Sequence, residues 1–195
     1  INEAKSIENV GADFIVAQGI EAGGHRGIFD QENIDEKISL DNLLIKVLEN
    51  VSLPVVAAGG IMAGRHIKRV INIGAKAAQL GTAFLTCPEA GTSLIHKHYL
   101  LNEQKRKTKI TKAFSGRMAR GIKNKFIEEM NGKKIFPFPI QNTITTSLRR
   151  VSQKNNNGEF INLWAGINFN QVRDLSAKDL MKKLAEEFKA ENSIN

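Results

Sequence analysis

The chain has 195 residues, of which 42% are hydrophobic and 25% are charged, and it carries a formal net charge of +8. These values argue against disorder, and the single cysteine excludes a scaffold held by internal disulfides. No uncharged apolar run approaches the roughly 18 residues that a membrane-spanning helix needs, and the first residues show no signal-peptide pattern. We therefore expect a cytoplasmic protein with no membrane partner.

Three helix-then-strand units are predicted within residues 1–86. Apolar residues at helical spacing predict helices over residues 4–10, 40–48 and 67–71. Short apolar runs predict strands over residues 14–17, 55–58 and 77–80. Ser39 is placed to cap the second helix, and each strand ends in a loop rich in glycine or polar residues.

This order of elements predicts an α/β fold with right-handed crossovers. Short apolar strands without alternation are typical of a parallel sheet that is buried on both faces. Functional residues at the carboxyl ends of consecutive strands fit either a (β/α)8 barrel or a doubly wound open sheet. A barrel takes about 200–250 residues for its eight units, so in a barrel this chain would form the carboxyl-terminal part only.

The alternation stops after Thr82. After it, residues 88–106 are predicted to be helical and residues 119–130 to form a helix. Loops and short helices are predicted over residues 132–157. Ser176 opens the last predicted helix with a capping-box pattern that Asp179 completes.

We therefore divide the chain into three parts. They are barrel units (1–86), a small, mostly helical inserted domain (87–160), and a return segment with a terminal helix (161–195).

The loop over residues 18–27, which reads QGIEAGGHRG, is the most informative segment. Its glycines let the backbone approach a flat or anionic ligand without interference from Cβ atoms. His25 follows a predicted buried strand, and an imidazole with a pKa near 6.5 suits a general base or acid. A structural histidine in a glycine-rich turn is an alternative of equal weight.

Gly59-Gly60 and Gly81-Thr82 end the next two predicted strands. In a barrel, the loops after the last two strands commonly bind phosphate through backbone N–H groups. Thr82 adds a hydroxyl, and Gln79 is placed to hydrogen-bond a cofactor ring or ribityl chain. Neither loop matches a Walker motif or a GxGxxG fingerprint, and each dipeptide alone is compatible with an ordinary tight turn.

Other reactive residue types are predicted to be structural. Cys87 is expected to pack in the core, and His96 and His98 are spaced to point to different sides of a helix, which is poor for a metal. Ser115 lacks the GxSxG pattern of an esterase. The basic residues up to Arg150 fit a solvated face or a lid over an anionic ligand better than a nucleic-acid surface, since stacking aromatics are few.

Several segments together resemble the nitronate monooxygenase family. They are QGIEAGGHRG (18–27), PVVAAGGI (54–61), GAKAAQLGTAFL (74–85), SGRMARG (115–121) and LWAG (163–166). The resemblance covers roughly residues 4–166. The first motif is quite specific, whereas the second and third recur in other FMN-binding barrels.

The resemblance implies an FMN-dependent enzyme on a TIM barrel, of which this chain is the carboxyl-terminal part, with a helical domain inserted after the last strand. Such enzymes oxidise alkyl nitronates with dioxygen to a carbonyl compound and nitrite. The family's histidine falls on His25, which would abstract the α-proton of a neutral nitroalkane or lie beside a bound nitronate. The family's FMN contacts fall on Gln18, Gly23, Gly60, Gln79, Leu80, Gly81 and Thr82.

Two alternatives remain at this point. The related FMN- and NAD(P)H-dependent enoyl-acyl-carrier-protein reductases share the EAGGH motif, although Gln18 and Arg26 are closer to the monooxygenases. The chain can also be an inactive partial barrel, or one that needs its missing amino-terminal half as a partner. Because a partial barrel exposes open strand edges, we expect this polypeptide alone to bind FMN weakly or not at all.

Overall fold

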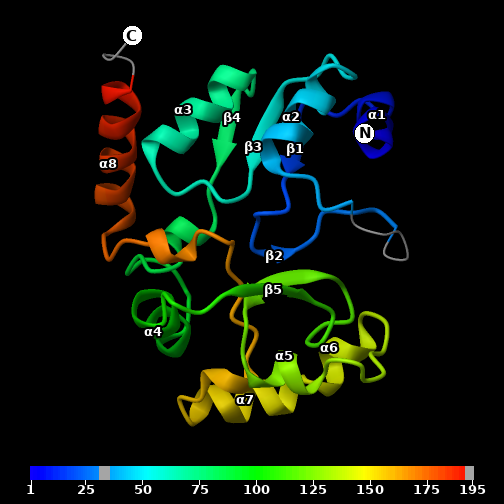
Figure 1. Cartoon of the computed structure of the whole chain (residues 1–195), viewed down its shortest axis with the longest axis vertical. Coiled ribbons are helices and arrows are strands. Elements are labelled where there is room, and N and C mark those ends of the chain that lie inside the picture. Colours follow the sequence, from blue (N-terminus) through cyan, green and yellow to red (C-terminus); the bar gives the residue numbers. More distant parts are fainter. Residues whose placement is uncertain (31–35, 192–195) are drawn as a thin grey trace.

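The computed structural model describes residues 1–30 and 36–191, and it has an α/β fold built on two small sheets (Figure 1). The first sheet is parallel, with strand order β1-β3-β4. Its strands are β1 (Ile15–Gln18), β3 (Val55–Ala58) and β4 (Ala77–Gln79). The helices beside it are α1 (Asn2–Asn9), α2 (Leu40–Leu48), α3 (Gly64–Ile73) and α8 (Ala177–Ala190). The predicted helix-then-strand units are confirmed, with small differences at their ends.

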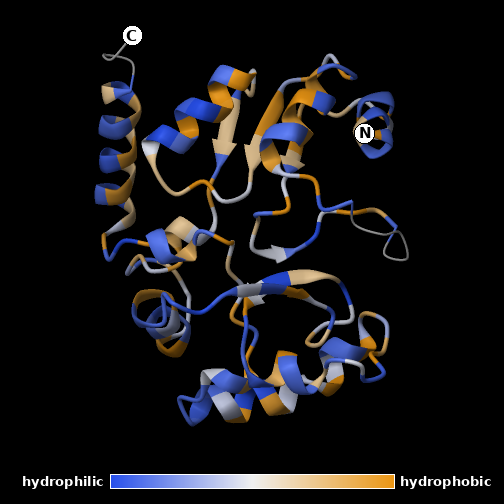
Figure 2. Cartoon of the chain, in the orientation of Figure 1, coloured by the Kyte–Doolittle hydropathy of each residue, from blue (hydrophilic) through white to orange (hydrophobic). Residues whose placement is uncertain are grey.

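One face of the parallel sheet is packed against helices. Ile15 and Ala17 of β1 share this face with their register partners Val55 and Ala57 of β3, and all four are buried. They pack in one cluster with Leu40, Leu44 and Val47 of α2 and Val70 of α3. Figure 2 shows hydrophobic residues concentrated on these strands, whereas the helices also carry hydrophilic residues. The apolar stripe that predicted α2 is therefore its core-facing side.

The opposite face of the sheet is largely open. Val16, Val56 and Ala77 form one row across it, followed by a row of Gln18, Ala58 and Gln79. Val16 is 41% exposed, and Ala77 and Gln79 are exposed as well. The prediction of strands buried on both faces is therefore wrong for β1 and β4, because within the described residues they are the outer strands and their second face has no full cover.

Helix α8 packs beside α3, which connects the end of the chain to the parallel half. The carboxylate of Glu187 accepts a hydrogen bond of 2.8 Å from the backbone N–H of Gly64, at the start of α3, and forms an ion pair with Arg173. The predicted cap is confirmed: the Ser176 hydroxyl accepts a hydrogen bond of 3.0 Å from the N–H of Asp179.

The second sheet is antiparallel, with strand order β2-β6-β5. Its strands are β2 (Gly24–His25), β6 (Ala119–Ile122) and β5 (Thr108–Thr111). The loop that follows β1 thus supplies an edge strand to a sheet whose other strands come from the later part of the chain. In Figure 1 this sheet lies between the parallel half and the remaining helices.

The predicted helix over residues 119–130 is wrong in its first part. Residues 119–122 form β6, and only α5 (Lys125–Glu129) is helical, starting after Asn124, whose side chain accepts a hydrogen bond from the N–H of Ile127. Strand β6 pairs with β2 and β5, and the N–H of Ile122 also donates a hydrogen bond to the carbonyl of Leu163. These long-range partners outweigh the local helical preference.

The other helices of this half surround the antiparallel sheet. They are α4 (Leu94–Asn102), α6 (Ile140–Ile144) and α7 (Thr146–Lys154). Three short 3-10 turns also occur: η1 (Thr82–Phe84) precedes α4, and η2 (Gly158–Phe160) and η3 (Phe169–Gln171) follow α7. Helices in the segments 88–106 and 132–157 are confirmed. None of the described helices is both long and apolar enough to cross a bilayer.

Two further buried clusters support this half. One joins it to α8 and includes Cys87, which is 1% exposed and therefore packs as predicted. The other is a small aromatic cluster in which Phe114 lies 4.8 Å from the Phe126 ring and 5.7 Å from the Trp164 ring. These packed side chains set the positions of the loops described next.

Candidate functional site

The carboxyl ends of β1, β3 and β4 meet around a small cavity of about 110 Å³. Among its lining residues are six of the predicted cofactor contacts: Gln18, Gly23, Gly60, Gln79, Gly81 and Thr82. The structure therefore brings these positions together from three separate loops. Leu80 is not among the lining residues, because its side chain packs against the core clusters.

Backbone N–H groups give this cavity its chemical character. In the described ranges, the N–H groups of Gly60, Gly81 and Thr82 donate no hydrogen bond to the protein. Gly60 has a φ of +66°, and a Cβ there would lie 3.0 Å from the Cβ of Glu21. Only glycine fits that turn without strain. N–H groups collected in this way bind the oxygens of an anion such as phosphate.

Three side chains that line the cavity also form hydrogen bonds with other parts of the chain. The amide of Gln18 donates to the carbonyl of His25 at 3.1 Å and accepts from the N–H of Gly27 at 2.8 Å. The hydroxyl of Thr82 accepts from the N–H of Gly166 at 3.0 Å, which leaves its proton available to a ligand. Asn168, which the sequence did not single out, donates from its amide to the carbonyl of Gly60 at 2.7 Å.

Two charged residues of the QGIEAGGHRG loop, Glu21 and Arg26, stabilise its conformation. The Glu21 carboxylate accepts from the N–H of Leu40 at 3.0 and 3.2 Å and so caps α2. The predicted cap by Ser39 is wrong, because Ser39 makes no side-chain hydrogen bond to the helix and Glu21 takes that place. The Arg26 guanidinium is buried and donates to the carbonyl of Gly19 at 2.9 Å.

Gly23 is where the loop meets the return segment. A Cβ at Gly23 would lie 2.5 Å from backbone atoms of Ala165 and Gly166. The N–H of Ile167 donates to the carbonyl of Glu21 at 3.0 Å in the same crossing. Glycine at this position is therefore required by the close approach of two backbones.

His25 lies in β2, opposite Ala119 of β6, and its imidazole faces the aromatic cluster. Its Nε2 atom is 2.8 Å from the Oγ of Ser115, and its ring centroid is 5.6 Å from that of Trp164. Burial lowers the pKa of His25 below its usual value, and the positive charge of Arg117 lowers it further. The imidazole is therefore neutral at pH 7 and can accept a proton.

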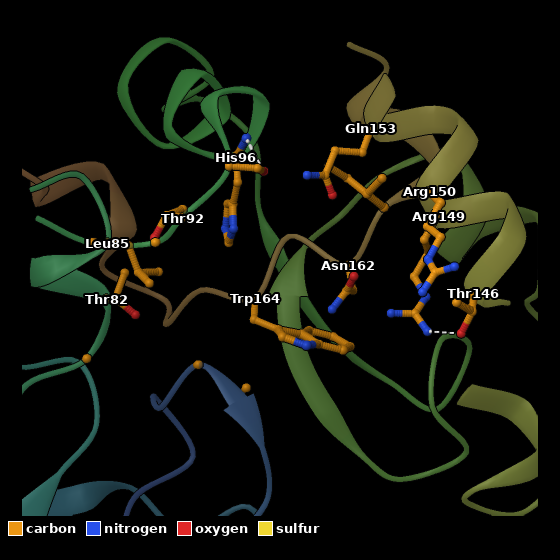
Figure 3. A pocket seen from close by; sticks show the side chains of 17 residues that line it. Thr82, Leu85, Thr92, His96, Thr146, Arg149, Arg150, Gln153, Asn162 and Trp164 are labelled. Carbon is orange, nitrogen blue, oxygen red and sulfur yellow. Dashed lines mark hydrogen bonds between the residues drawn. The ribbon is translucent and has the colours of Figure 1, made fainter. Parts of the chain in front are cut away.

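A larger cavity of about 780 Å³ opens beside these loops (Figure 3). It extends from Gly24 and Thr82 to helices α4 and α7, and its labelled walls include Trp164, Asn162, His96 and Arg149. Because Gly23, Gly81 and Thr82 line both cavities, the two hollows adjoin.

His96 enters this cavity although its spacing predicted no role. Burial lowers the pKa of His96 to about 4, against the effect of its hydrogen bond to the backbone of Trp164. Its buried Nε2 atom has no hydrogen-bond partner in the described part of the chain. The side chain is thus a neutral acceptor facing the cavity. The described residues contain no group of three or more side chains placed to hold a metal ion.

Arg149 and Arg150 form the α7 side of the cavity. The Nη2 atom of Arg149 donates to the carbonyl of Asn142 at 2.8 Å and to the Thr146 hydroxyl at 3.1 Å, whereas its buried Nε has no partner among the described residues. No Asp or Glu is among the residues that line this cavity. The cavity therefore favours an anionic ligand.

The residues that the sequence missed share one property. Trp164, Asn168, His96 and Arg149 come from segments distant from the predicted strand ends, and the fold brings them there. Two signals in the sequence pointed to some of them: the LWAG motif includes Trp164, and the basic residues up to Arg150 include Arg149.

Comparisons with known proteins agree with this arrangement. The family model described as nitronate monooxygenase matches residues 1–187. A probable nitronate monooxygenase of Staphylococcus aureus (strain Newman) is 44% identical over 169 residues, covering 85% of this chain and 48% of the relative. One of Bacillus subtilis (strain 168) is 37% identical over 190 residues, covering 96% and 55%. The chain therefore spans about half the length of the curated relatives it matches.

Solved structures give the same result. A crystal structure of nitroalkane oxidase from Streptomyces ansochromogenes matches with a TM-score of 0.95 and 40% identity, covering 100% of this chain and 57% of the other. FabK from Thermotoga maritima matches with a TM-score of 0.80 and 27% identity, covering 98% and 59%. With the family model covering nearly the whole chain, this protein belongs to the nitronate monooxygenase family.

Proposed function

We propose that the protein carrying this chain oxidises alkyl nitronates with dioxygen to a carbonyl compound and nitrite, with FMN as its cofactor. The observation that carries the proposal is the meeting of three strand ends around one set of unused N–H groups, with a neutral imidazole on the adjoining loop. The likeness to nitroalkane oxidase from Streptomyces ansochromogenes supports it.

The described residues fit FMN. The N–H groups of Gly60, Gly81 and Thr82 suit its phosphate, and Gln18 and Gln79 border the same cavity with amide groups. Gly23 and the backbone of Leu80 complete the proposed contacts. When bound, FMN supplies the electron chemistry of the oxidation, and the protein supplies binding, orientation and electrostatics.

We propose that residues 1–86 are the carboxyl-terminal units of a TIM barrel, that 87–160 are an inserted lid domain, and that 161–195 return to the barrel, although 192–195 lie outside the described residues. The open face of the parallel sheet supports this, because apolar Val16 and Val56 lie where a barrel has its interior. The missing amino-terminal half is the partner that would cover this face, and we place the protein in the cytoplasm.

A second candidate is an enoyl-acyl-carrier-protein reductase that uses FMN and NAD(P)H. The structural match to FabK from Thermotoga maritima favours it, at a lower TM-score and identity than the nitroalkane oxidase. Both candidates need the same flavin site, so the reaction and not the fold distinguishes them.

The deciding assay uses the FMN-loaded protein that carries this chain. We expect release of nitrite from a nitronate in the presence of dioxygen, and no oxidation of NADH with an enoyl thioester. NADH oxidation with the thioester and no nitrite would favour the reductase. If neither reaction occurs, the chain is an inactive member of the family.

Replacement of Arg149 by Gln is expected to raise KM for an anionic nitronate by about tenfold, which is the effect of losing one charge-assisted contact. The reason is that Arg149 gives the cavity positive charge without a carboxylate beside it. KM for the conjugate neutral nitroalkane should stay unchanged, because that substrate carries no charge. Steady-state kinetics with both forms of one substrate measure the difference.

Lys154→Gln is the matched control for the Arg149 experiment. It removes one positive charge from the same helix, but Lys154 is exposed and does not line the cavity. Two outcomes would show that Arg149 does not bind the anion. One is an equal rise of KM for the neutral and the anionic substrate in Arg149→Gln. The other is a rise of KM for the nitronate in Lys154→Gln as large as that in Arg149→Gln.

A further inference from the structure

We propose that Ser115 is a positioning residue for His25: its hydroxyl holds the imidazole with the proton on Nε2, and so makes Nδ1 the nitrogen that receives the substrate proton. This inference rests on the proposed function, in which His25 takes the α-proton of a neutral nitroalkane. Ser115 lies between β5 and β6, far from His25 in sequence.

The hydrogen bonds around the Ser115 hydroxyl determine the direction of its bond to His25. The Ser115 Oγ lies 3.2 Å from the carbonyl oxygen of Arg117 and 3.3 Å from the backbone nitrogen of Arg117. A carbonyl oxygen can only accept, whereas an imidazole nitrogen can also donate, so the three contacts of the hydroxyl are all satisfied only when its single proton goes to the Arg117 carbonyl. The oxygen of Ser115 therefore accepts at 2.8 Å from Nε2 of His25, which must carry a proton. In the neutral ring the lone pair is then on Nδ1.

Ser115 is held firmly enough to impose this choice. It is 3% exposed and follows Phe114, whose ring is buried in the aromatic cluster. The carbonyl of Phe114 accepts a hydrogen bond of 2.7 Å from the hydroxyl of Thr145, and the N–H of Gly116 donates to the carbonyl of Lys112 at 2.8 Å. Hydrogen bonds on both sides of Ser115 thus fix its backbone, and the hydroxyl follows it.

Although His25 is exposed, its backbone and one side of its ring are also held in place. The backbone of His25 is paired with Ala119 of β6, and its carbonyl accepts from the amide of Gln18. Trp164 lies against the ring at an interplanar angle of 57°. In the described part of the chain, the remaining ring nitrogen, Nδ1, makes no hydrogen bond. It is therefore the nitrogen available to a substrate.

The proton transfer balances without further groups. The α C–H bond of the nitroalkane breaks, its electron pair stays on the substrate to form the nitronate, and the proton forms a bond to Nδ1. The resulting imidazolium keeps its Nε2–H directed at the Ser115 oxygen, a bond that strengthens with the positive charge. Arg117 is the charged side chain that acts on His25 from the same segment, and it favours return of the proton.

The first test needs no catalysis. In the ¹⁵N-labelled protein that carries this chain, NMR correlation of the histidine rings should show His25 with a slowly exchanging Nε2–H, assigned by its loss in His25→Asn. Ser115→Ala should abolish the slow exchange, and Ser115→Thr should restore it. Ser152→Ala, which removes a buried hydroxyl from α7 in the same half of the chain, should leave it unchanged. A proton on Nδ1, or an Nε2–H signal unaltered in Ser115→Ala, would overturn the proposal.

Kinetics provide the second readout. Ser115→Ala should lower kcat for a neutral nitroalkane about tenfold and shift the acid limb of its pH profile to lower pH, since the imidazolium loses an acceptor. Oxidation of the preformed nitronate should be unaffected, and Ser152→Ala should move neither property. An unchanged pH profile in Ser115→Ala contradicts the positioning role. If the NMR result holds but no variant oxidises a nitroalkane, the proposed function fails and the assignment of the ring proton stands.

Discussion

Replacement of His25 by asparagine is expected to lower kcat/KM for a neutral nitroalkane by about 10²–10⁴-fold, the usual effect of losing a general base. Oxidation of the preformed nitronate should fall by less than about tenfold, because that substrate has already lost its proton. Asparagine is too short to reach the Ser115 hydroxyl, but the backbone pairing of residue 25 with Ala119 does not involve the imidazole, so the loop should keep its position. Nitrite release from both substrate forms, at one enzyme concentration, measures the contrast.

The role of His25 as a base also predicts how the activity on a neutral nitroalkane depends on pH. Because burial and Arg117 lower the pKa of His25, its imidazole stays neutral from pH 7 down to a pH below the usual pKa of histidine. Activity on the neutral nitroalkane should therefore decline only in more acidic solution, and His25→Asn should remove that decline. His98→Asn serves as the control, since the His98 ring contacts Asn102 and Tyr99 of its own helix α4 and not Ser115 or Trp164. Equal losses on nitroalkane and nitronate would argue against His25 as the base.

Truncation of Phe114 to alanine is expected to destabilise the antiparallel half by about 3–5 kcal/mol. The ring is 1% exposed and contacts both Phe126 and Trp164, so its removal leaves a cavity in the smallest of the three clusters. Hydrogen exchange with mass spectrometry should show faster exchange in β5, β6 and α5. Peptides from β1 and β3 should be little changed, because they belong to another cluster.

Leu44→Ala is the reciprocal variant for Phe114→Ala. Leu44 is fully buried in the cluster between α2 and the parallel sheet, and its truncation should cost about 2–5 kcal/mol. Here exchange should increase in β1 and β3 and not in β6. If each variant raises exchange equally in both halves, the chain unfolds as one unit and the proposed inserted domain has no independent stability.

The sequence was sufficient to predict the parallel half because its signals are local. The apolar positions of α2 follow the helical period, and Gly59-Gly60 and Gly81-Thr82 mark where β3 and β4 stop. Because the carboxyl ends of neighbouring parallel strands lie at one edge of a sheet, Gln18, Gly60 and Thr82 were predicted to lie together, and they line one cavity.

The antiparallel half could not be predicted in the same way. Residues 119–122 become a strand only because β2 and β5 lie on either side of them, and both partners are distant in sequence or follow an irregular loop. His96 and Arg149 line the larger cavity because of the way α4 and α7 pack. The spacing of residues along a single helix gives no information about that packing. Leu80, in turn, was predicted from a motif but its side chain belongs to the core.

The pairing of β2 with β6 has a consequence for engineering within this family. Gly24 and His25 form an edge of a sheet whose other strands belong to residues 108–122, and Arg120 of β6 donates from its Nε to the carbonyl of Ile20 at 2.9 Å. A graft that exchanges only residues 87–160 between relatives would set the imidazole against a foreign strand. A chimera that preserves the site must transplant the loop over residues 18–27 together with the insertion.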